Sequence, residues 1–524
     1  MTAVLDRISG EAPADIEVVV TDDTTDVKVA TDLKGISVRL PGPLAKHSEE
    51  AWPSSFRWFS RKDGRVELSA RYGKAANGKA LLAPPEKDYR PERIGIALGE
   101  ESVLPERGFS VLATLRAIPV EPWQEDLQSI LDAAAKTSGE AAMDSLDPVK
   151  IRVKTRELIF KARTFPQITA TVSRSLSGAR VPVWQLALDS PNGRGNASYR
   201  PENGSNPASI TADLDYLYVP EEGRRRFGRM FEETPAEHLP SMNVRIRKLV
   251  VDEMSLGDLQ ISAKAGNAQA EHRVWKLDTF TVKNPGADLQ ASGRWVKGPA
   301  ENFTEVKGSI VSKDGERLMK SLALPADVVR GAAGRVDLSL RWKGSPQDFQ
   351  AKNLGGAVKA DLGGGQFLQV EPGIAGRFLS LLSMQSLIKR LTLDFKDVVG
   401  KGLAFNSIRM TGAIDRGVFS TEDLAVDCPA AAILISGTAD FATQRLDAGV
   451  VVLPNLHTEA PALALTLANP VLGVSSFLAQ FALKKPLSYM LGTKYRASGP
   501  WGSLSFKKEP LFKTPSKTDS ESTP

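Results

Sequence analysis

Residues able to do acid–base, nucleophilic or metal chemistry are few and scattered in this chain. Four histidines lie far apart, and none has a second metal ligand at helical or loop spacing: His47, His238, His272 and His457. No serine sits in a nucleophile-elbow motif, and no glycine-rich loop is followed by the lysine of a phosphate-binding site. The sequence therefore predicts no catalytic residues, no metal site, no cofactor and no enzyme activity.

The remaining polar clusters have simple structural interpretations. The acidic stretch 22–26 could bind Ca²⁺, but a solvated hairpin turn is the favoured interpretation. The three arginines at 224–226 fit a solvated helix face, with contact to anionic headgroups as the alternative. The single cysteine, Cys428, excludes a disulfide within the chain.

The elements that would position any site are predicted to be mainly β-strands. Apolar and polar residues alternate in many segments, and residues 336–342 are a clear example. This pattern indicates an elongated antiparallel β-sheet or solenoid with a few peripheral amphipathic helices, and its apolar side is able to form an apolar groove. The groove candidates in this segment are Val336, Leu338, Leu340 and Trp342. Alternation alone does not distinguish an open groove from a sheet packed on an ordinary core.

Composition narrows the class of partner. The 524 residues are 42% hydrophobic and 25% charged, and 67 basic residues face 62 acidic ones, giving a net charge of +5. The basic residues are dispersed along strands rather than clustered with stacking aromatics, so a nucleic-acid partner is not expected. A mild positive charge is compatible with anionic lipid headgroups.

Three regions are expected along the chain. Residues 1–242 are a β-rich part with helices near 122–135 and 221–231, and residues 243–512 form a second region with a short helix at 314–322. The tail 513–524, rich in Ser, Thr, Lys and Pro, is expected to be disordered.

Two apolar segments in the second region are candidate membrane contacts. Residues 374–389 place apolar side chains on one face of a helix, which either docks on the sheet or lies at a membrane surface. Residues 460–483 contain no charged residue, but Asn469 and Pro470 interrupt them, which favours a strand, a turn and an amphipathic helix at 474–490 over a membrane span. The membrane-contact candidates are Ile374, Phe378, Leu381, Leu382, Phe477, Leu478 and Phe481.

An ordered series of motifs carries a family resemblance. Residues 365–373, 381–387, 390–398, 469–473 and 495–501 together resemble the C-terminal region of the AsmA-like envelope protein family, YhdP branch. The resemblance extends from about Asn243 to Phe506.

This resemblance implies a periplasmic, non-enzymatic lipid-transfer conduit. Such proteins are held in the inner membrane by an N-terminal helix and carry phospholipid towards the outer membrane along an apolar β-groove, which supports outer-membrane integrity. This chain lacks that anchor, so we expect it to depend on an upstream anchored segment or on other envelope proteins. The partners implied are phospholipid and a membrane surface contacted by the C-terminal helices. The alternative is an envelope scaffold with a self-filled β core and partner-binding C-terminal helices.

Overall fold

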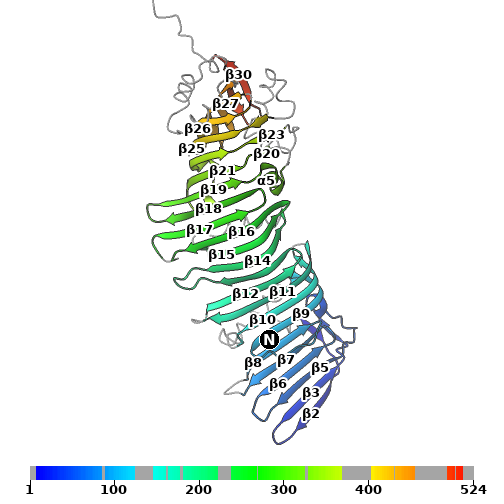
Figure 1. The fold of residues 1–524 in the computed structure, drawn as a ribbon. Coiled ribbons are helices and arrows are strands. Elements are labelled where there is room, and N and C mark those ends of the chain that lie inside the picture. Colours follow the sequence, from blue (N-terminus) through cyan, green and yellow to red (C-terminus); the bar gives the residue numbers. More distant parts are fainter. Residues whose placement is uncertain are drawn as a thin grey trace, which may run out of the picture. The chain divides into compact units, whose positions relative to one another are not determined.

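The computed structural model confirms a mainly β, mostly antiparallel fold (Figure 1). Within the described residues, 25 strands belong to one long mixed sheet. The structure describes residues 7–84, 89–123, 146–160, 163–177, 181–221, 238–267, 270–324, 329–368, 403–429, 431–454, 492–501 and 503–510.

The chain divides into two compact units. The N-terminal unit comprises residues 1–204 and 208–218, and the C-terminal unit comprises residues 205–207 and 219–524. The strand pairings below are given for each unit by itself.

In the N-terminal unit, most strands pair with their neighbours in sequence. The paired series is β2 (Asp15–Val20), β3 (Thr25–Thr31), β5 (Ser54–Ser60), β6 (Val66–Tyr72), β7 (Ala76–Ala83), β8 (Arg90–Leu98), β9 (Gly108–Pro119), β10 (Val149–Phe160), β11 (Arg163–Ser177), β12 (Val181–Ser190), β13 (Gly193–Arg200) and β14 (Ser209–Val219). The short turns between most of these strands make antiparallel pairing the natural outcome.

Strand β9 breaks the antiparallel pattern because it pairs in parallel with both β8 and β10. The connection from β8 to β9 crosses one face of the sheet. Asn77 fixes it, since its side chain accepts from the Ser102 N–H at 2.5 Å and donates to the Glu100 carbonyl at 2.7 Å. Gly95 lies directly beneath, where a Cβ would come within 2.2 Å of the Val103 carbonyl oxygen. A side chain at position 95 would therefore push this connection away.

A second long connection, residues 32–53, separates β3 from β5. It contains the 3-10 helix η1 (Gly42–Leu44) and β4 (Ile36–Val38), which pairs with β1 (Ile8–Gly10) from the segment before β2. Lys46 is only 2% exposed, and its Nζ donates to the carbonyls of Leu33, Ile36 and His47 at 2.7, 2.9 and 3.0 Å. These three hydrogen bonds of the ammonium group thus hold residues 33, 36 and 47 of this connection close to one another.

In the C-terminal unit, consecutive strands of the main sheet pair antiparallel. This series runs through β15 (Ser241–Val251), β16 (Met254–Ala265), β17 (Arg273–Lys283), β18 (Ala287–Lys297), β19 (Asn302–Ser312), β21 (Gly334–Lys343), β22 (Gly355–Leu362), β25 (Ser407–Asp415), β26 (Val418–Asp427), β27 (Ala431–Asp440), β28 (Arg445–Pro454), β29 (Thr493–Pro500) and β30 (Ser505–Glu509).

Smaller elements lie beside this series. A three-stranded sheet is formed by β20 (Val329–Gly331), β23 (Gly365–Phe367) and β24 (Leu403–Phe405), and two 3-10 helices, η3 (Pro346–Asp348) and η4 (Ala351–Asn353), follow β21. The helix predicted at 314–322 is confirmed as α5 (Gly315–Ser321), because Asp314 caps it by accepting from the Arg317 N–H at 2.9 Å.

Other predicted helices fall largely outside the described residues. Residues 120–123 and residue 221 are helical, at the start of the segments predicted near 122–135 and 221–231. The remainder of those two segments and the tail 513–524 lie beyond what the structure describes, as do the helices predicted at 374–389 and 474–490.

Candidate functional site

The predicted groove residues of β21 share one face of their strand. Val336, Leu338 and Leu340 alternate with polar residues, so their side chains point to the same side of the sheet. In the register with β19 they lie opposite Ile310, Gly308 and Val306, and in the register with β22 opposite Ala360, Val358 and Gly356. The apolar positions of three neighbouring strands are therefore aligned side by side.

Trp342, the fourth predicted groove residue, packs at the end of the strand. It is 8% exposed, its indole N–H donates to the Ser345 carbonyl at 2.8 Å, and its ring meets that of Phe349 edge-on at 5.4 Å. It forms a buried cluster with Leu354 and Ile414. The structure thus leaves Val336, Leu338 and Leu340 as the partly exposed members of the predicted set.

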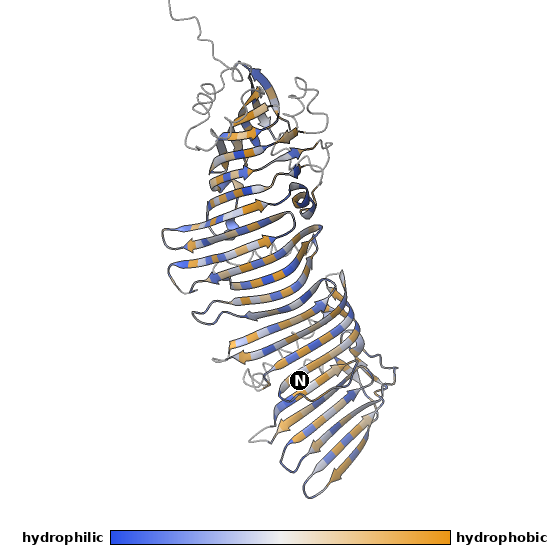
Figure 2. Ribbon diagram, viewed as in Figure 1, coloured by the Kyte–Doolittle hydropathy of each residue, from blue (hydrophilic) through white to orange (hydrophobic). Residues whose placement is uncertain are grey.

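The same register aligns apolar side chains across the rest of the C-terminal unit. On each strand the residues facing the side of Leu338 are mostly aliphatic or aromatic, as the alternating colours along the strands indicate (Figure 2). Towards β15 they include Leu277, Phe280, Leu289, Ile261 and Val244. Towards β30 they include Met410, Phe419, Ile433, Val450 and Phe506. We call this surface the apolar face of the C-terminal unit.

The N-terminal unit has an apolar face of its own, and much of it is exposed. Pairings from β2 to β14 place aliphatic and aromatic residues on one side of this sheet. Ordinary soluble proteins rarely expose a large contiguous apolar surface. Eight large apolar side chains of this face are well exposed: Ile16, Val18, Val20, Phe56, Ile96, Trp184, Leu186 and Tyr199.

At the β25–β30 end of the C-terminal unit, the apolar face is covered. Phe405 of β24 and Ala332 lie in one buried cluster with Val426, Ile433 and Val450 of the main sheet. Further side chains of β20, β23 and β24 pack against the cluster, and the rings of Phe367 and Phe405 lie 4.9 Å apart. This part of the face is filled by the protein itself.

The opposite face of each sheet is polar and is bridged by cross-strand ion pairs. Glu305 contacts Arg294 at 3.0 Å and Arg341 at 3.3 Å, which links β18, β19 and β21. In the N-terminal unit Arg57 donates twice to Asp26, at 2.8 and 2.9 Å, and this hydrogen bonding lowers the pKa of the Asp26 carboxyl. Exposed pairs of this kind are screened by solvent and contribute little to stability, so they mainly fix the register of the strands.

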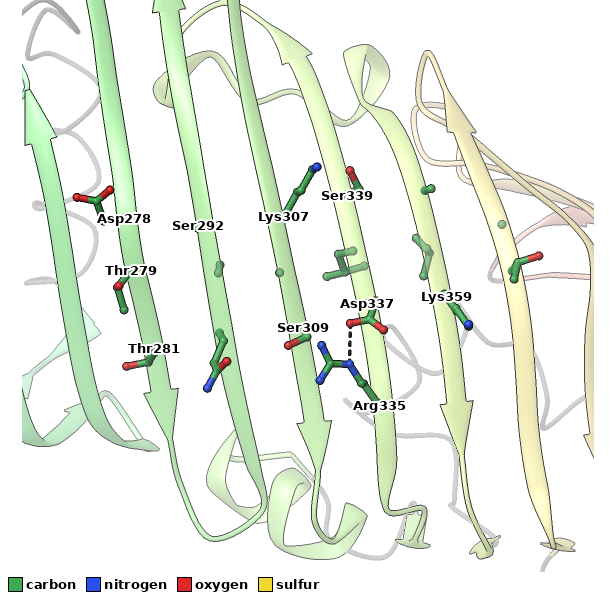
Figure 3. Close-up of a pocket in the computed structure, with 18 residues that line it drawn as sticks. Asp278, Thr279, Thr281, Ser292, Lys307, Ser309, Arg335, Asp337, Ser339 and Lys359 are labelled. Atoms are coloured by element: carbon green, nitrogen blue, oxygen red, sulfur yellow. Dashed lines mark hydrogen bonds and ion pairs between the residues drawn. The ribbon is translucent and has the colours of Figure 1, made fainter. Parts of the chain in front are cut away.

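One hollow of the C-terminal unit lies mainly on this polar face. Its volume is about 790 Å³, and its labelled lining side chains come from β17, β18, β19, β21 and β22 (Figure 3). Acidic and basic groups are mixed there, and Arg335 donates to Asp337 at 2.8 Å. Of the predicted groove residues, only Leu338 is among the residues around this hollow. The hollow and the predicted groove are therefore different surfaces.

Groups suited to catalysis are not brought together in the described part of the chain. Among those residues, no three His, Cys, Asp or Glu side chains are placed to hold a metal ion. Cys428 is buried, and burial raises the pKa of its thiol to about 12, so the thiolate is disfavoured at neutral pH.

The predicted membrane-contact residues lie outside the described residues. They are Ile374, Phe378, Leu381, Leu382, Phe477, Leu478 and Phe481. Within the described ranges, no helix combines the length and the apolar composition needed to cross a membrane.

Sequence reasoning missed the exposed apolar face of the N-terminal unit. Its signal was present, because Phe56 and Trp58 alternate with polar residues, as do Trp184 and Leu186 in a later strand. The pattern shows that a strand has an apolar side, whereas exposure depends on what packs against that side.

Comparison with known proteins identifies the family. The family model described as YhdP protein matches residues 1–503, which extends well beyond the C-terminal motifs. The protein named intermembrane phospholipid transporter YhdP from Escherichia coli (strain K12) is 25% identical over 504 residues. The alignment covers 91% of this chain and 36% of that protein, so the chain spans about a third of the length of its relative. With strands of this pattern and a family match over nearly its whole length, the chain belongs to the YhdP family.

Proposed function

We propose that this chain carries phospholipid along the apolar faces of its sheets, between the inner and outer membranes of a cell envelope, without doing chemistry on it. The observation that carries the proposal is the register-matched apolar face of each unit, exposed over eight large side chains in the N-terminal unit. The relative named as an intermembrane phospholipid transporter supplies the class of ligand.

The physical reason is the cost of moving acyl chains through water. Transfer of each methylene from water to an apolar wall is favourable by about 0.8 kcal/mol of free energy. A wall of Leu, Val, Ile and Phe side chains provides this gain anywhere along its length, so a lipid can shift from strand to strand without a specific binding site. The polar face carries cross-strand pairs such as Arg57–Asp26, which help to fix the register of the strands, and it faces water.

The covered end of the apolar face limits where lipid would run. The buried cluster around Ile433 and Val450 occupies that surface, so in the C-terminal unit we assign lipid contact to β15–β22. This self-filled core also favours a second candidate function, an envelope scaffold, for the β25–β30 part of the chain.

The proposed location is the periplasm, with attachment to the inner membrane through an upstream anchored segment or another envelope protein. The apolar residues of 374–389 and 474–490 are proposed to contact a membrane surface. Their test is vesicle flotation of the full chain, which Phe378→Asp together with Phe481→Asp should reduce.

Photo-crosslinking tests lipid contact directly. Probes at Leu338 and Leu340 face the apolar side of β21, while probes at Ser339 and Arg341 face the polar side of the same strand. Protein purified from envelopes should give phospholipid adducts only from the first pair, detected by mass spectrometry. A probe at the buried Ile433 should give none. Equal labelling of both faces, or no labelling of Leu338 and Leu340 in folded protein, would leave the scaffold function.

A further inference from the structure

A row of cations lies on the polar face of the N-terminal unit, at the middle of its sheet. Every second residue of β10 from 150 to 156 is basic, and all four side chains are exposed on that face: Lys150, Arg152, Lys154 and Arg156. The exposed Arg116 of β9 lies beside Arg156, because the residues on either side of the two arginines are register partners. We call these five residues the basic row.

The basic row lacks ion-pair partners. In other parts of the same face, pairs such as Arg57–Asp26 and Arg194–Asp189 balance the charge. Within the described part of the chain, no side chain of the row forms an ion pair. Glu100 approaches β9, but its carboxylate accepts from the Thr114 hydroxyl at 2.9 Å and does not pair with the row. Like charges on neighbouring strands are unfavourable, so the row is suited to an anionic partner.

We propose that the basic row binds an extended, carboxylate-rich segment of another protein, which lies along β10. Alternate residues of a strand are about 6.8 Å apart, so the four basic side chains of β10 form a line about 20 Å long. An extended segment with Asp or Glu at every second position repeats its carboxylates at the same interval, again about 6.8 Å. Each carboxylate then meets one cation, and an arginine can donate two parallel hydrogen bonds to it.

The shape and the surroundings of the basic row favour a linear protein segment over a membrane or a nucleic acid. The row is one strand wide apart from Arg116, and the β11 residues beside it are the neutral Thr169, Thr171 and Ser173. Along the row, the described residues of β9, β10 and β11 present no aromatic side chain on this face. Interfacial membrane contacts combine basic residues with apolar anchors, and single-stranded nucleic acid stacks its bases on aromatic rings.

Binding of two synthetic peptides to the full chain tests the proposed geometry. Both contain four glutamates and four threonines, so at about 3.4 Å per residue either one covers the row. In the first peptide the two residues alternate, which places all four carboxylates on one side of an extended chain. In the second the glutamates come in adjacent pairs, so only two of the four face the same side. Fluorescence anisotropy should show that the alternating peptide binds about fivefold more tightly, and that salt weakens its binding.

A charge-matched pair of variants locates the binding. The first replaces the four cations of β10 together: Lys150→Gln, Arg152→Gln, Lys154→Gln and Arg156→Gln. All four are exposed, so the circular dichroism spectrum should not change, and affinity for the alternating peptide should fall by about tenfold or more. The control removes four ion-paired cations from the polar face of the C-terminal unit and should bind as the unmodified chain does: Lys264→Gln, Lys276→Gln, Arg294→Gln and Arg341→Gln.

Three results would overturn the inference. Equal loss of affinity in the two variants, or equal affinity for the two peptides, would mean attraction by net charge alone. Absence of peptide binding at low ionic strength would remove the acidic segment as the partner. Flotation with phosphatidylglycerol vesicles that the β10 variant abolishes, without peptide binding, would assign the row to a membrane instead. The row lies on the polar face, so none of these results bears on lipid carriage along the apolar face.

Discussion

Leu186→Asp gives the sharpest test of the proposed apolar path. Leu186 lies at the middle of β12 on the apolar face of the N-terminal unit, between Val172 and Ala197 in the registers of the neighbouring strands. It is 38% exposed, so the substitution removes little packing, and surface changes of this kind usually shift the free energy of unfolding by less than about 0.5 kcal/mol.

The expected effect on lipid follows from the spacing of the strands. Neighbouring strands are about 4.8 Å apart, which corresponds to roughly four methylenes of an extended acyl chain lying across them. If a carboxylate prevents those methylenes from resting on the wall, about 3 kcal/mol is lost at about 0.8 kcal/mol per methylene. Because 1.4 kcal/mol is a tenfold change in an equilibrium constant, phospholipid occupancy at this strand should fall by about a hundredfold.

The matched control is Ala187→Asp. Ala187 is the next residue of the same strand, is exposed, and faces the polar side opposite Thr171 and Asn196. Both variants gain one negative charge, so a general electrostatic effect would appear in both. The assay is photo-crosslinking of phospholipid at the neighbouring apolar-face residue Leu188, with circular dichroism to check folding. Equal adduct yields in the two variants would refute the reasoning that the apolar face, rather than net charge, holds the lipid.

Three further predictions concern the folded protein. Lys46→Met removes the donor from three backbone carbonyls, so it should destabilise residues 33–47 by about 2–4 kcal/mol, measured by hydrogen exchange. Lys34→Met, at an exposed lysine, should have no effect, and equal exchange in the two variants would contradict this. Gly95→Val should displace the β8–β9 connection and lower the thermal midpoint, whereas an unchanged midpoint would mean that the connection shifts freely. Since burial raises the pKa of Cys428 to about 12, its folded-state thiol should resist iodoacetamide at pH 8.5 and react at once after unfolding; rapid labelling of the native chain would contradict its burial.

Much of the fold was predictable from local pattern. Alternation in segments such as 336–342 specified strands with one apolar side, and the short helix predicted at 314–322 lies close to its observed bounds. The family motifs pointed to the YhdP family, although they suggested only the C-terminal half, and the family match reaches residue 1. The parallel pairing of β9 was not predictable, because strand direction depends on how the connection of residues 99–107 crosses the sheet.

The sequence by itself determined that nearly every strand has an apolar and a polar side, because side chains alternate along an extended backbone whatever it packs against. Only the tertiary structure decided what becomes of the apolar side at each strand. Around Ile433 it is buried under a second small sheet, and around Leu186 it is exposed. Trp342 and Leu340 follow the same alternation, yet the first is buried at the end of the strand and the second lies partly open. Burial depends on contacts between residues far apart in the chain, and alternation carries no information about those contacts.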